Sequence, residues 1–578
     1  MSGILAVPEF LFAFVAMLGV LITVHEFGHF IAAKLCGVRV LKFSIGFGPP
    51  IGIGRFKLAW QRSGTDYVIA WFPLGGFVRM LGDTNEDMVG DKTEEPDWAN
   101  DPELAQQTLG SKKLWQKLFI IGAGPAMNLI LPIFLLWGTL VAGFERGVAV
   151  VGNVERASPA AAAGLLPGDR IVAVDGEKVA WWDEVESEVR SRPAGRVTLA
   201  VERPVAGASP ERLHMELDVA SRPGIDVLQD TFDVGWLGLQ HERQKAVLGV
   251  TDGASRAAQA GLRSGDRVVA VAGTPVEDWT GFARAYETAG SSGTVPLRIE
   301  RGAADPKETV EIAAPALGNV EALGVIPAVV LVAAVTADSP AAQAGLSPGD
   351  LIVAVDGQPI GSFVTFQETV FASKGRSLTI QVAKDGQTRT AQVTPRKTKT
   401  GQGGEELFMI GIQGENAVLL GSGALYRELN PLVAIPRAVE LTWERTALFL
   451  RAFKKLILGE IPRNNLGGPI EIARQSHLAL QRGIQDFIQL VVLISINLGI
   501  LNLLPIPILD GGHGLLFLIE GLRGSPVSLK AQLAFQKVGL VVIGSLVVFS
   551  LFNDSMRLVE RWRSHHDLQE QAPAAESP

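Results

Sequence analysis

A short polar cluster, HEFGH at residues 25–29, lies inside an N-terminal stretch that is otherwise almost entirely apolar. Between Pro8 and Leu35 the ionisable residues are Glu9, His25, Glu26, His29 and Lys34. A helix that rises about 1.5 Å per residue places His25 roughly 26 Å beyond Pro8, within a hydrocarbon layer of about 30 Å. Ionisable side chains at that depth are costly and usually serve a function. The sequence therefore predicts that HEFGH acts inside a membrane, near one of its faces.

The spacing within HEFGH is typical of a metal site. Histidines four residues apart lie on one helix face, one turn apart, so that both imidazoles can reach one metal ion, and Glu26 between them can act on a metal-bound water. In a soluble helix, chance would be the better explanation of such a short pattern, but the depth in the membrane favours the metal site. A third histidine six residues after His29 is missing, because that position is Leu35. A third ligand must then come from far along the chain.

A second polar cluster, NLLPIPILDGGH at residues 502–513, closes another long apolar run. Pro505 and Pro507 remove helix hydrogen bonds, so we expect the chain to turn near Asp510. The Asp510 carboxylate is a candidate third metal ligand, and capping of the following helix is the alternative role. His513 is the local rival as a ligand.

HEFGH in a first span and LDGGH after a third resemble the site-2 protease family of intramembrane zinc proteases, of the bacterial regulator-of-sigma-E protease type. The resemblance covers the chain from its start to about Arg563. It implies that His25, His29 and Asp510 bind Zn²⁺ and that Glu26 is the general base. It also implies that Asn502 holds the substrate backbone.

Two segments after the first span, VRVLKFSIGFGPP and DYVIAWFPLGGFVRMLG, are rich in β-branched and aromatic residues broken by glycine. This composition predicts strands with tight turns. An ordinary soluble hairpin is one interpretation, but unpaired strand edges cannot face lipid, so strands beside the site would line a protein cavity. The family resemblance implies a membrane re-entrant sheet in which Gly46, Phe47 and Gly48 bind the unwound substrate by strand addition.

Four membrane spans are expected, over about residues 7–35, 115–144, 487–504 and 535–552. Lys34 and Lys112 lie at the inner ends of the first two, so the positive-inside rule places both chain termini outside the cell membrane. The hydrophobic share of 47% fits a mixed membrane and soluble protein. The net charge of -8, without a basic cluster, gives no basis for nucleic-acid binding.

Three related segments start at Ser158, Ser255 and Ser339, 97 and 84 residues apart. Each predicts an Ala-rich helix, a Gly-Leu cap, a turn ending in Gly-Asp and a buried strand. Such spacing indicates domains rather than short solenoid repeats. The segments resemble three tandem PDZ domains of the bacterial permuted kind, which either bind peptides by strand addition or only gate access sterically.

The second copy differs from the others at one turn position. It carries Ala272 where the first and third copies have Asp175 and Asp356. We therefore expect a different turn in the second copy.

The predicted fold is a polytopic α-helical membrane protein with four spans, a membrane re-entrant β segment and three tandem α+β PDZ-like domains. Its expected parts are the first span with HEFGH (1–36), the re-entrant β region and cytoplasmic loop (37–111), the second span (112–145), three PDZ-like domains (146–241, 242–327, 328–414), amphipathic membrane-face helices (415–485), the third span with LDGGH (486–522), the fourth span (523–563) and a disordered tail (564–578).

The predicted function is an intramembrane zinc metalloprotease. The resemblance implies single-span membrane substrates in a bilayer, such as anti-sigma factors already shortened by another protease, or remnant signal peptides. It also implies the bacterial inner membrane, with the PDZ-like domains and both termini on the periplasmic side. The alternative is a membrane PDZ scaffold with a vestigial metal site, against which the presence of every catalytic residue argues.

Overall fold

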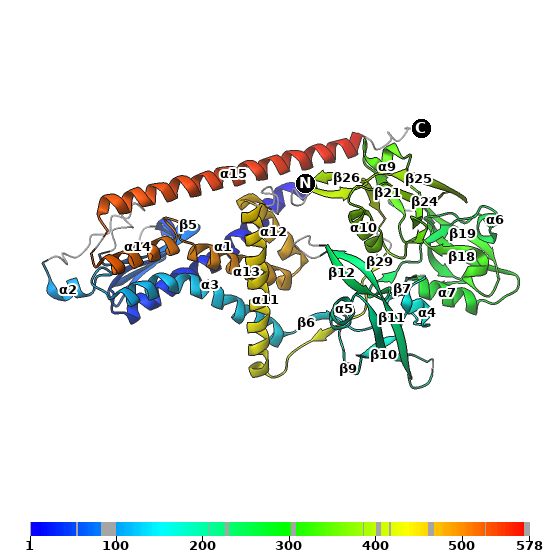
Figure 1. Ribbon diagram of the computed structural model, residues 1–578, viewed down its shortest axis with the longest axis horizontal. Coiled ribbons are helices and arrows are strands. Elements are labelled where there is room, and N and C mark those ends of the chain that lie inside the picture. The colour runs from blue at the N-terminus through cyan, green and yellow to red at the C-terminus, as the bar shows by residue number, and fades with distance from the viewer. Residues whose placement is uncertain are drawn as a thin grey trace. The chain divides into compact units, whose positions relative to one another are not determined.

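The computed structural model describes residues 2–53, 56–82, 100–155, 157–205, 207–225, 231–301, 308–384, 386–399, 406–415, 418–459, 467–525 and 527–570. The chain divides into two compact units (Figure 1). The first is formed by Met1–Phe144 and Tyr426–Pro578 together with Gly401–Gly404, and the second by Glu145–Thr400 and Glu405–Leu425.

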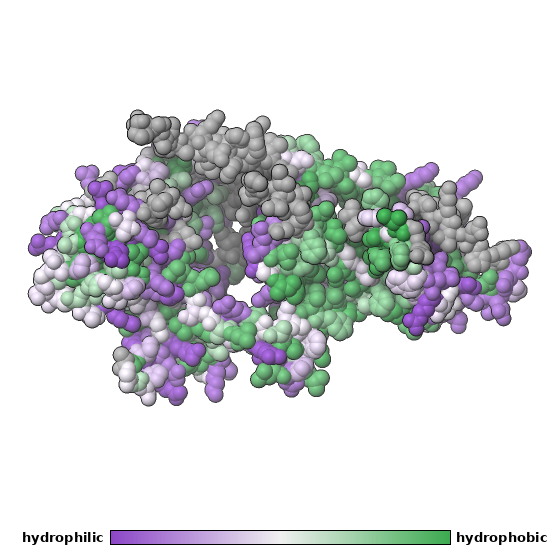
Figure 2. All heavy atoms as spheres, turned by 180° about the vertical axis from the view of Figure 1, so that it is seen from behind, coloured by the Kyte–Doolittle hydropathy of each residue, from purple (hydrophilic) through white to green (hydrophobic). Residues whose placement is uncertain are grey.

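Four helices of the first unit are long and apolar enough to cross a membrane, which confirms the four predicted spans. The helices are α1 (Ser2–Leu35), α3 (Leu114–Ala142), α13 (Ile484–Leu503) and α15 (Leu529–Glu570). At most a third of each apolar window is buried inside the protein, and hydrophobic side chains gather on the surface of this unit (Figure 2). That exposed apolar surface fits contact with lipid.

The end of α15 differs from our prediction. The helix continues to Glu570, so the disordered tail predicted from residue 564 is wrong as far as residue 570. Residues 571–578 lie outside the described part of the chain.

Helix α3 packs against α1 because small residues face each other. A Cβ atom on Gly28 would lie 2.4 Å from the Ala123 carbonyl oxygen, and one on Gly124 would lie 2.3 Å from Nε2 of His29. The GAGPAMN segment of α3 (residues 122–128) therefore serves helix packing. It brings α3 against the histidine face of α1.

The predicted part that holds the third span and LDGGH (486–522) contains two helices. Helix α13 ends at Leu503, and α14 (Asp510–Arg523) begins after a turn that contains Pro505 and Pro507. Gly511 and Gly512 let α14 fold back on this turn, because Cβ atoms there would lie 2.2 and 2.3 Å from backbone oxygens of Leu504 and Ile506.

Two helices between the repeat segment and α13 are amphipathic. Helix α11 (Pro431–Leu458) buries Ala434, Ala438 and Thr442, while apolar residues on other faces are exposed.

The start of α12 (Pro469–Arg482) is capped from α15, whose buried Asp554 carboxylate accepts hydrogen bonds from the N–H groups of Gly468, Ile470 and Glu471. The segment NNLGGPIEIA (464–473), which includes the start of α12, begins outside the described residues, which omit 460–466.

The predicted strand segment forms a three-stranded sheet of order β1-β5-β4, from β1 (Val40–Pro50), β5 (Thr65–Met80) and β4 (Ala59–Arg62). A small hairpin joins β2 (Gly52–Ile53) and β3 (Phe56–Lys57). Val40, Phe43, Val78 and Met80 pack with Ala32 of α1. The sheet therefore lies directly beside the helix that carries HEFGH. In the acidic loop that follows, residues 83–99 are outside the described part, and α2 (Pro102–Gln106) comes after them.

The second unit contains three repeat domains, at the segments where we predicted PDZ-like folds. The first comprises β7 (Asn153–Val154), α4 (Pro159–Ala162), β8 (Arg170–Val174), β9 (Glu177–Lys178), α5 (Trp182–Arg190), β10 (Gly195–Arg203), β11 (Glu211–Ile225), β12 (Thr231–Trp236) and β13 (Leu239–Gln240). The second comprises β15 (Leu248–Val250), α6 (Arg256–Gln259), β16 (Arg267–Val271), β17 (Thr274–Pro275), α7 (Trp279–Thr288), β18 (Thr294–Arg301), β19 (Glu308–Pro315), α8 (Val320–Leu323) and β20 (Val325–Pro327). The third comprises β21 (Val332–Val335), α9 (Pro340–Gln343), β22 (Leu351–Val355), β23 (Gln358–Pro359), α10 (Phe363–Ala372), β24 (Leu378–Lys384), β25 (Gln387–Val393), β26 (Arg396–Lys399), β27 (Glu406–Met409) and β28 (Ile412–Gly414).

The three domains share one sheet pattern. Their main sheets have the orders β12-β11-β10-β8-β9, β17-β16-β18-β19 and β23-β22-β24-β25. Two further strand pairs bound this unit: β14 (Arg243–Gln244) with β29 (Val418–Leu419), and β6 (Phe144–Gly147) with β30 (Gly423–Tyr426). Each domain has its own buried apolar core.

The repeated Gly-Asp turn has a structural role. The aspartates Asp169, Asp266 and Asp350 are at most 1% exposed, and each accepts a hydrogen bond from an arginine of a neighbouring strand at 2.6–2.7 Å. Each also accepts the backbone N–H three residues earlier. Charge pairing and these hydrogen bonds offset the cost of burying the carboxylate, although Oδ1 of Asp350 has no hydrogen-bond partner within the described chain.

The turn of the second repeat does not differ as we expected. Ala272 has a φ of 46°, close to the 49° of both Asp175 and Asp356. In the first and third domains the aspartate Oδ1 accepts a backbone N–H, from Thr198 or Thr379. In the second domain the Ala272 N–H donates to Pro296, which has no N–H to return. An aspartate at 272 would therefore lack its donor.

This pairing predicts that two substitutions act together. Ala272→Asp combined with Pro296→Thr should stabilise the second repeat domain by about 1 kcal/mol, because it restores the missing hydrogen bond. Ala272→Asp alone should gain less. Hydrogen exchange of the amides around residue 272, measured on the whole protein in detergent, compares the variants. Equal protection in the single and double variants would contradict the hydrogen-bond explanation.

Candidate metal centre

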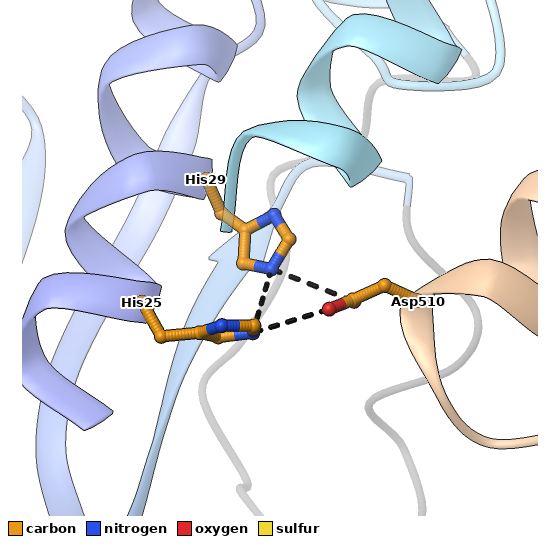
Figure 3. Close-up of side chains that lie close together, drawn as sticks. All are labelled: His25, His29 and Asp510. Atoms are coloured by element: carbon orange, nitrogen blue, oxygen red, sulfur yellow. Dashed lines mark hydrogen bonds and ion pairs between the residues drawn. The ribbon is translucent and has the colours of Figure 1, made fainter. Parts of the chain in front are cut away.

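Three side chains from α1 and α14 converge on one point (Figure 3). His25 and His29 are 8% and 7% exposed, and their Nε2 atoms lie 3.3 Å apart. Asp510, the first residue of α14, places Oδ2 3.1 Å from Nε2 of His25 and Oδ1 3.5 Å from Nε2 of His29. Asp510 does not cap α14, whose N-cap is Leu509 without a side-chain hydrogen bond. Among the described residues, His513 is not part of the group.

The donor set fits a zinc ion. Four ligands about 2.0–2.1 Å from a tetrahedral centre lie about 3.3–3.4 Å from one another. Here the two Nε2 atoms are 3.3 Å apart, and the two Asp510 oxygens lie 3.1 Å from that of His25 and 3.5 Å from that of His29. Two imidazole nitrogens and a carboxylate oxygen that face each other need a cation or protons between them. Three protein ligands leave the fourth position for water, as in catalytic zinc sites.

Hydrogen bonds behind the histidines set their orientation. Nδ1 of His29 donates to the Ile120 carbonyl oxygen at 2.9 Å, which leaves its Nε2 free to bind a metal. Nδ1 of His25 lies 3.1 Å from the side-chain amide of Asn128, a fully buried residue of α3. The Ser495 hydroxyl donates to the backbone carbonyl oxygen of Asn128 at 2.6 Å.

The amide of Asn128 has one arrangement that suits a metal-bound histidine. His25 can bind a metal through Nε2 only with its proton on Nδ1, and that proton needs an acceptor. Oδ1 of Asn128 is buried and has no hydrogen-bond partner in the present orientation. Rotating the amide by 180° brings Oδ1 to His25. Sequence reasoning did not identify Asn128 as a partner of His25; the signal available in the sequence is an amide within an apolar span.

We expect Asn128→Ala to lower zinc affinity by about 10- to 100-fold, the usual effect of removing such a partner. Asn128→Asp, which keeps an acceptor for the His25 proton, should lose less. Zinc retention against graded chelator concentrations measures the effect.

Asn497→Ala is the matched control, because its amide oxygen is also buried and unpaired but belongs to α13, away from the ligands. Equal zinc loss in the Asn128 and Asn497 alanine variants would show that Asn128 does not support the ligand.

Glu26 lies between the two histidines on α1 and is half-buried. A Cβ atom on Gly76 of β5 would lie 3.2 Å from Cγ of Glu26, so the glycine leaves room for this side chain beside the sheet. Within the described chain, the Glu26 carboxylate has no hydrogen-bond partner. It is therefore free to exchange a proton with a substrate or water.

The predicted substrate-binding segment lies in β1, a strand whose first half has strand partners on both flanks. Residues 42–45 each pair with two stretches of β5, whereas Phe47 pairs with Phe72 alone and Pro50 with Ala70 alone. Gly46 is buried, while Phe47 and Gly48 are exposed. From Phe47 onward, one flank of the strand therefore has no strand partner among the described residues.

Asn502 lies in the last turn of α13 and is half-buried. Its side chain makes no hydrogen bond to the described part of the chain, and therefore none to His25, His29 or Asp510.

Comparison with known proteins agrees with this geometry. The model of "Peptidase family M50" matches residues 13–546. The "Regulator of sigma-E protease RseP" of Escherichia coli (strain K12) is 32% identical over 549 residues, 94% of this chain and 98% of that protein. A "Putative zinc metalloprotease" of Xylella fastidiosa (strain 9a5c) is 29% identical over 540 residues, 93% of this chain and 96% of that protein. The chain belongs to peptidase family M50 and is a zinc metalloprotease.

Proposed function

We propose that this zinc protease cleaves peptide bonds inside the membrane, with His25, His29 and Asp510 as the metal ligands. The observation that supports this proposal is the position of the cluster. Both histidines belong to Leu11–Leu35, a helix segment apolar enough to cross a membrane, and are buried within the protein. A soluble substrate would have to enter the bilayer to reach them.

Glu26 acts as the general base and then as the general acid. Bound zinc polarises water and the scissile carbonyl group. The Glu26 carboxylate takes the proton of the attacking water and delivers it to the nitrogen of the leaving peptide as the C–N bond breaks. Its lack of a hydrogen-bond partner in the described chain leaves both carboxylate oxygens available for this exchange.

The exposed part of β1 receives the substrate as an added strand. Proteolysis needs an extended backbone, which a membrane helix does not offer, and an edge strand supplies partners for such a backbone. Phe47 and Gly48 lie where β1 has one open flank, and buried Gly46 precedes them. Asn502 binds the substrate backbone through its free amide.

The substrates are single-span membrane proteins in the bacterial inner membrane. The name of the E. coli relative describes a regulator of sigma-E, which favours an anti-sigma factor, already shortened by another protease, or a remnant signal peptide. The positions of Lys34 and Lys112 favour both termini and the repeat domains on the periplasmic side. The sheet of β1, β5 and β4 is then a membrane re-entrant element, and the repeat domains are PDZ-like.

The repeat domains act as a size filter for substrates. Three domains provide more bulk than a single peptide groove requires. Removing residues 147–413 should then allow cleavage of intact substrates that the full-length protein rejects.

The assay compares matched intact and shortened single-span substrates with both forms of the enzyme. Unchanged rejection of the intact substrate, with zinc still bound to the truncated protein, would contradict the filter.

A PDZ scaffold with a vestigial metal site is the competing function. Zinc content and peptide-bond cleavage by the wild type and by Glu26→Gln separate the two. A scaffold would release no cleavage product from a membrane substrate in either form.

A further inference from the structure

A cavity of about 480 Å³ lies on the first repeat domain, and it is bordered by residues of the third. Helix α5 contributes Val185 and Val189 to its lining, and the strand side contributes Val234 and Leu239. Helix α10 of the third domain contributes Thr365 and Glu368. The cavity is thus a groove between a helix and a strand, closed on one side by another domain.

The strand side of this groove offers unpaired backbone groups. The Glu155 N–H donates to the Gly238 carbonyl oxygen, and Leu239 is paired with Val154 of β7. Because bonding direction alternates along an antiparallel ladder, the N–H and C=O of Leu239 point away from β7, toward the groove. An extended peptide can pair with them as an additional strand.

The helix side is open in the first domain because its residues are small. Val185 and Val189 occupy the fourth and eighth positions of α5. The same positions of α7 hold Phe282 and Tyr286, both fully buried in the core of the second domain. Val185 and Val189 are also buried, at 2% and 8% exposed, so the two domains differ at these positions in the size of the side chain, and the smaller valines line the cavity of the first domain.

The other two domains present less suitable strands. In the second domain, the Ala328 N–H donates to the Val247 carbonyl oxygen. Because bonding direction alternates along the strand, the backbone N–H and C=O positions of residues 325 and 327 point away from β15, toward a possible ligand. Residue 327 is proline and has no N–H to offer. In the third, a Cβ atom on Gly414 would lie 2.7 Å from the Phe363 ring, so this ring covers the β28 backbone.

A buried polar network fixes the third domain beside the groove. Glu155 is 4% exposed, and its carboxylate accepts hydrogen bonds from Thr365 of α10 at 3.1 Å and from Gln240 at 3.1 Å. The Ser362 hydroxyl donates to Thr365 at 2.8 Å. A Cβ atom on Gly361 would lie 2.5 Å from Oε2 of Glu155, so glycine permits this approach.

The charges around the groove favour a basic ligand. Glu368 is half-buried at the wall, and its carboxylate has no hydrogen-bond partner among the described residues. Burial raises the pKa of Glu368, and nearby Glu155 acts in the same direction, although Arg190 and Arg222 oppose it. Glu186, another acidic residue of the lining, lies 3.8 Å from Arg190. A cationic side chain of a ligand would stabilise the unpaired Glu368 carboxylate.

We propose that the first repeat domain, completed by α10 of the third, is the peptide-binding site of the array. Its ligand is an extended peptide segment that adds a strand at Leu239, places an aliphatic side chain between Val185 and Val189, and pairs a lysine or arginine with Glu368. The second domain serves as a spacer without a peptide site. This inference does not depend on proteolysis.

The test uses the full-length protein in lipid nanodiscs, with Glu26→Gln to prevent cleavage. The probes are fluorescein-labelled octapeptides, blocked at both ends, in which one lysine is moved through each position of a valine- and threonine-rich sequence. A matched set carries glutamate in place of lysine. Fluorescence anisotropy should show saturable binding of at least one lysine peptide and weaker binding of its glutamate counterpart.

Two variants locate the site. Val185→Phe introduces the ring found at the same position of the second domain, and it should weaken binding by about tenfold or more because it fills the groove. Glu368→Gln should remove the preference for lysine over glutamate. Glu287→Gln, an exposed glutamate on α7 of the second domain, is the control and should change nothing.

Three outcomes would overturn the proposal. They are no saturable binding of any lysine peptide, binding that neither variant alters, and, in a parallel series of the same peptides with a free carboxyl terminus, binding by that series alone. Glu368→Gln keeps the test decisive if Val185→Phe disturbs folding, because residue 368 is only half-buried and its change preserves shape.

Discussion

Glu26→Gln is expected to abolish proteolysis while zinc stays bound. The amide keeps the size of the side chain but cannot take the proton of the attacking water, so the rate should fall by about 10²- to 10⁴-fold. Zinc should remain at about one ion per chain, because three other side chains form the ligand set. Cleavage of a shortened single-span substrate in nanodiscs and metal analysis of the same sample measure both properties.

Asp510→Ala, unlike Glu26→Gln, is expected to lower the zinc content sharply, because it removes one of the three proposed protein donors. His513→Ala, three residues along α14, is the matched control and should retain zinc. Full zinc retention in Asp510→Ala together with loss in His513→Ala would transfer the ligand role to His513. Full activity of Glu26→Gln would require a different base.

The metal site could be predicted to the extent that its pattern is local in the sequence. Two histidines one helical turn apart can be recognised as a candidate ligand pair from their spacing alone, because an α-helix places them on one face. Asp510 lies 481 residues after His29 and entered the ligand set through the family resemblance, with two prolines indicating only the turn before it. Asn128 could not be assigned to His25, because its contact depends on how closely α3 approaches α1 at Gly28 and Gly124.

The fold, like the metal site, could be predicted where its signal is local in the sequence and not where it depends on long-range contacts. Hydropathy identifies the four membrane helices, but it gives no signal for the end of α15, where a helix continues after the apolar run. Ala272 and Pro296 are both visible in the sequence, yet their connection requires the strand register that places one against the other. The closure of the first repeat domain by the third depends on a contact between Glu155 and Thr365, 210 residues apart, and no local pattern indicates it.

Phe47→Pro is expected to abolish cleavage without loss of zinc. Phe47 is 37% exposed and lies in the part of β1 that has one open flank. Proline fixes φ near −65° and removes the N–H, so the edge can no longer present the regular backbone that an added strand requires. The proposed zinc ligands lie on α1 and α14 and should be unaffected. Cleavage and zinc content of the purified variant are the two measurements.

Gln61→Pro provides the control for proline itself, since Gln61 is an exposed residue of β4, the opposite edge strand of the same sheet. A proline there should leave most of the activity if only β1 binds substrate. A change in the substrate tests the same pairing. The wild-type enzyme should cleave a substrate with two consecutive prolines at its cleavage region poorly, because that substrate cannot supply the matching N–H groups. Normal cleavage by a zinc-loaded Phe47→Pro enzyme would reduce the exposed part of β1 to a structural edge, because strand addition cannot tolerate proline at that position.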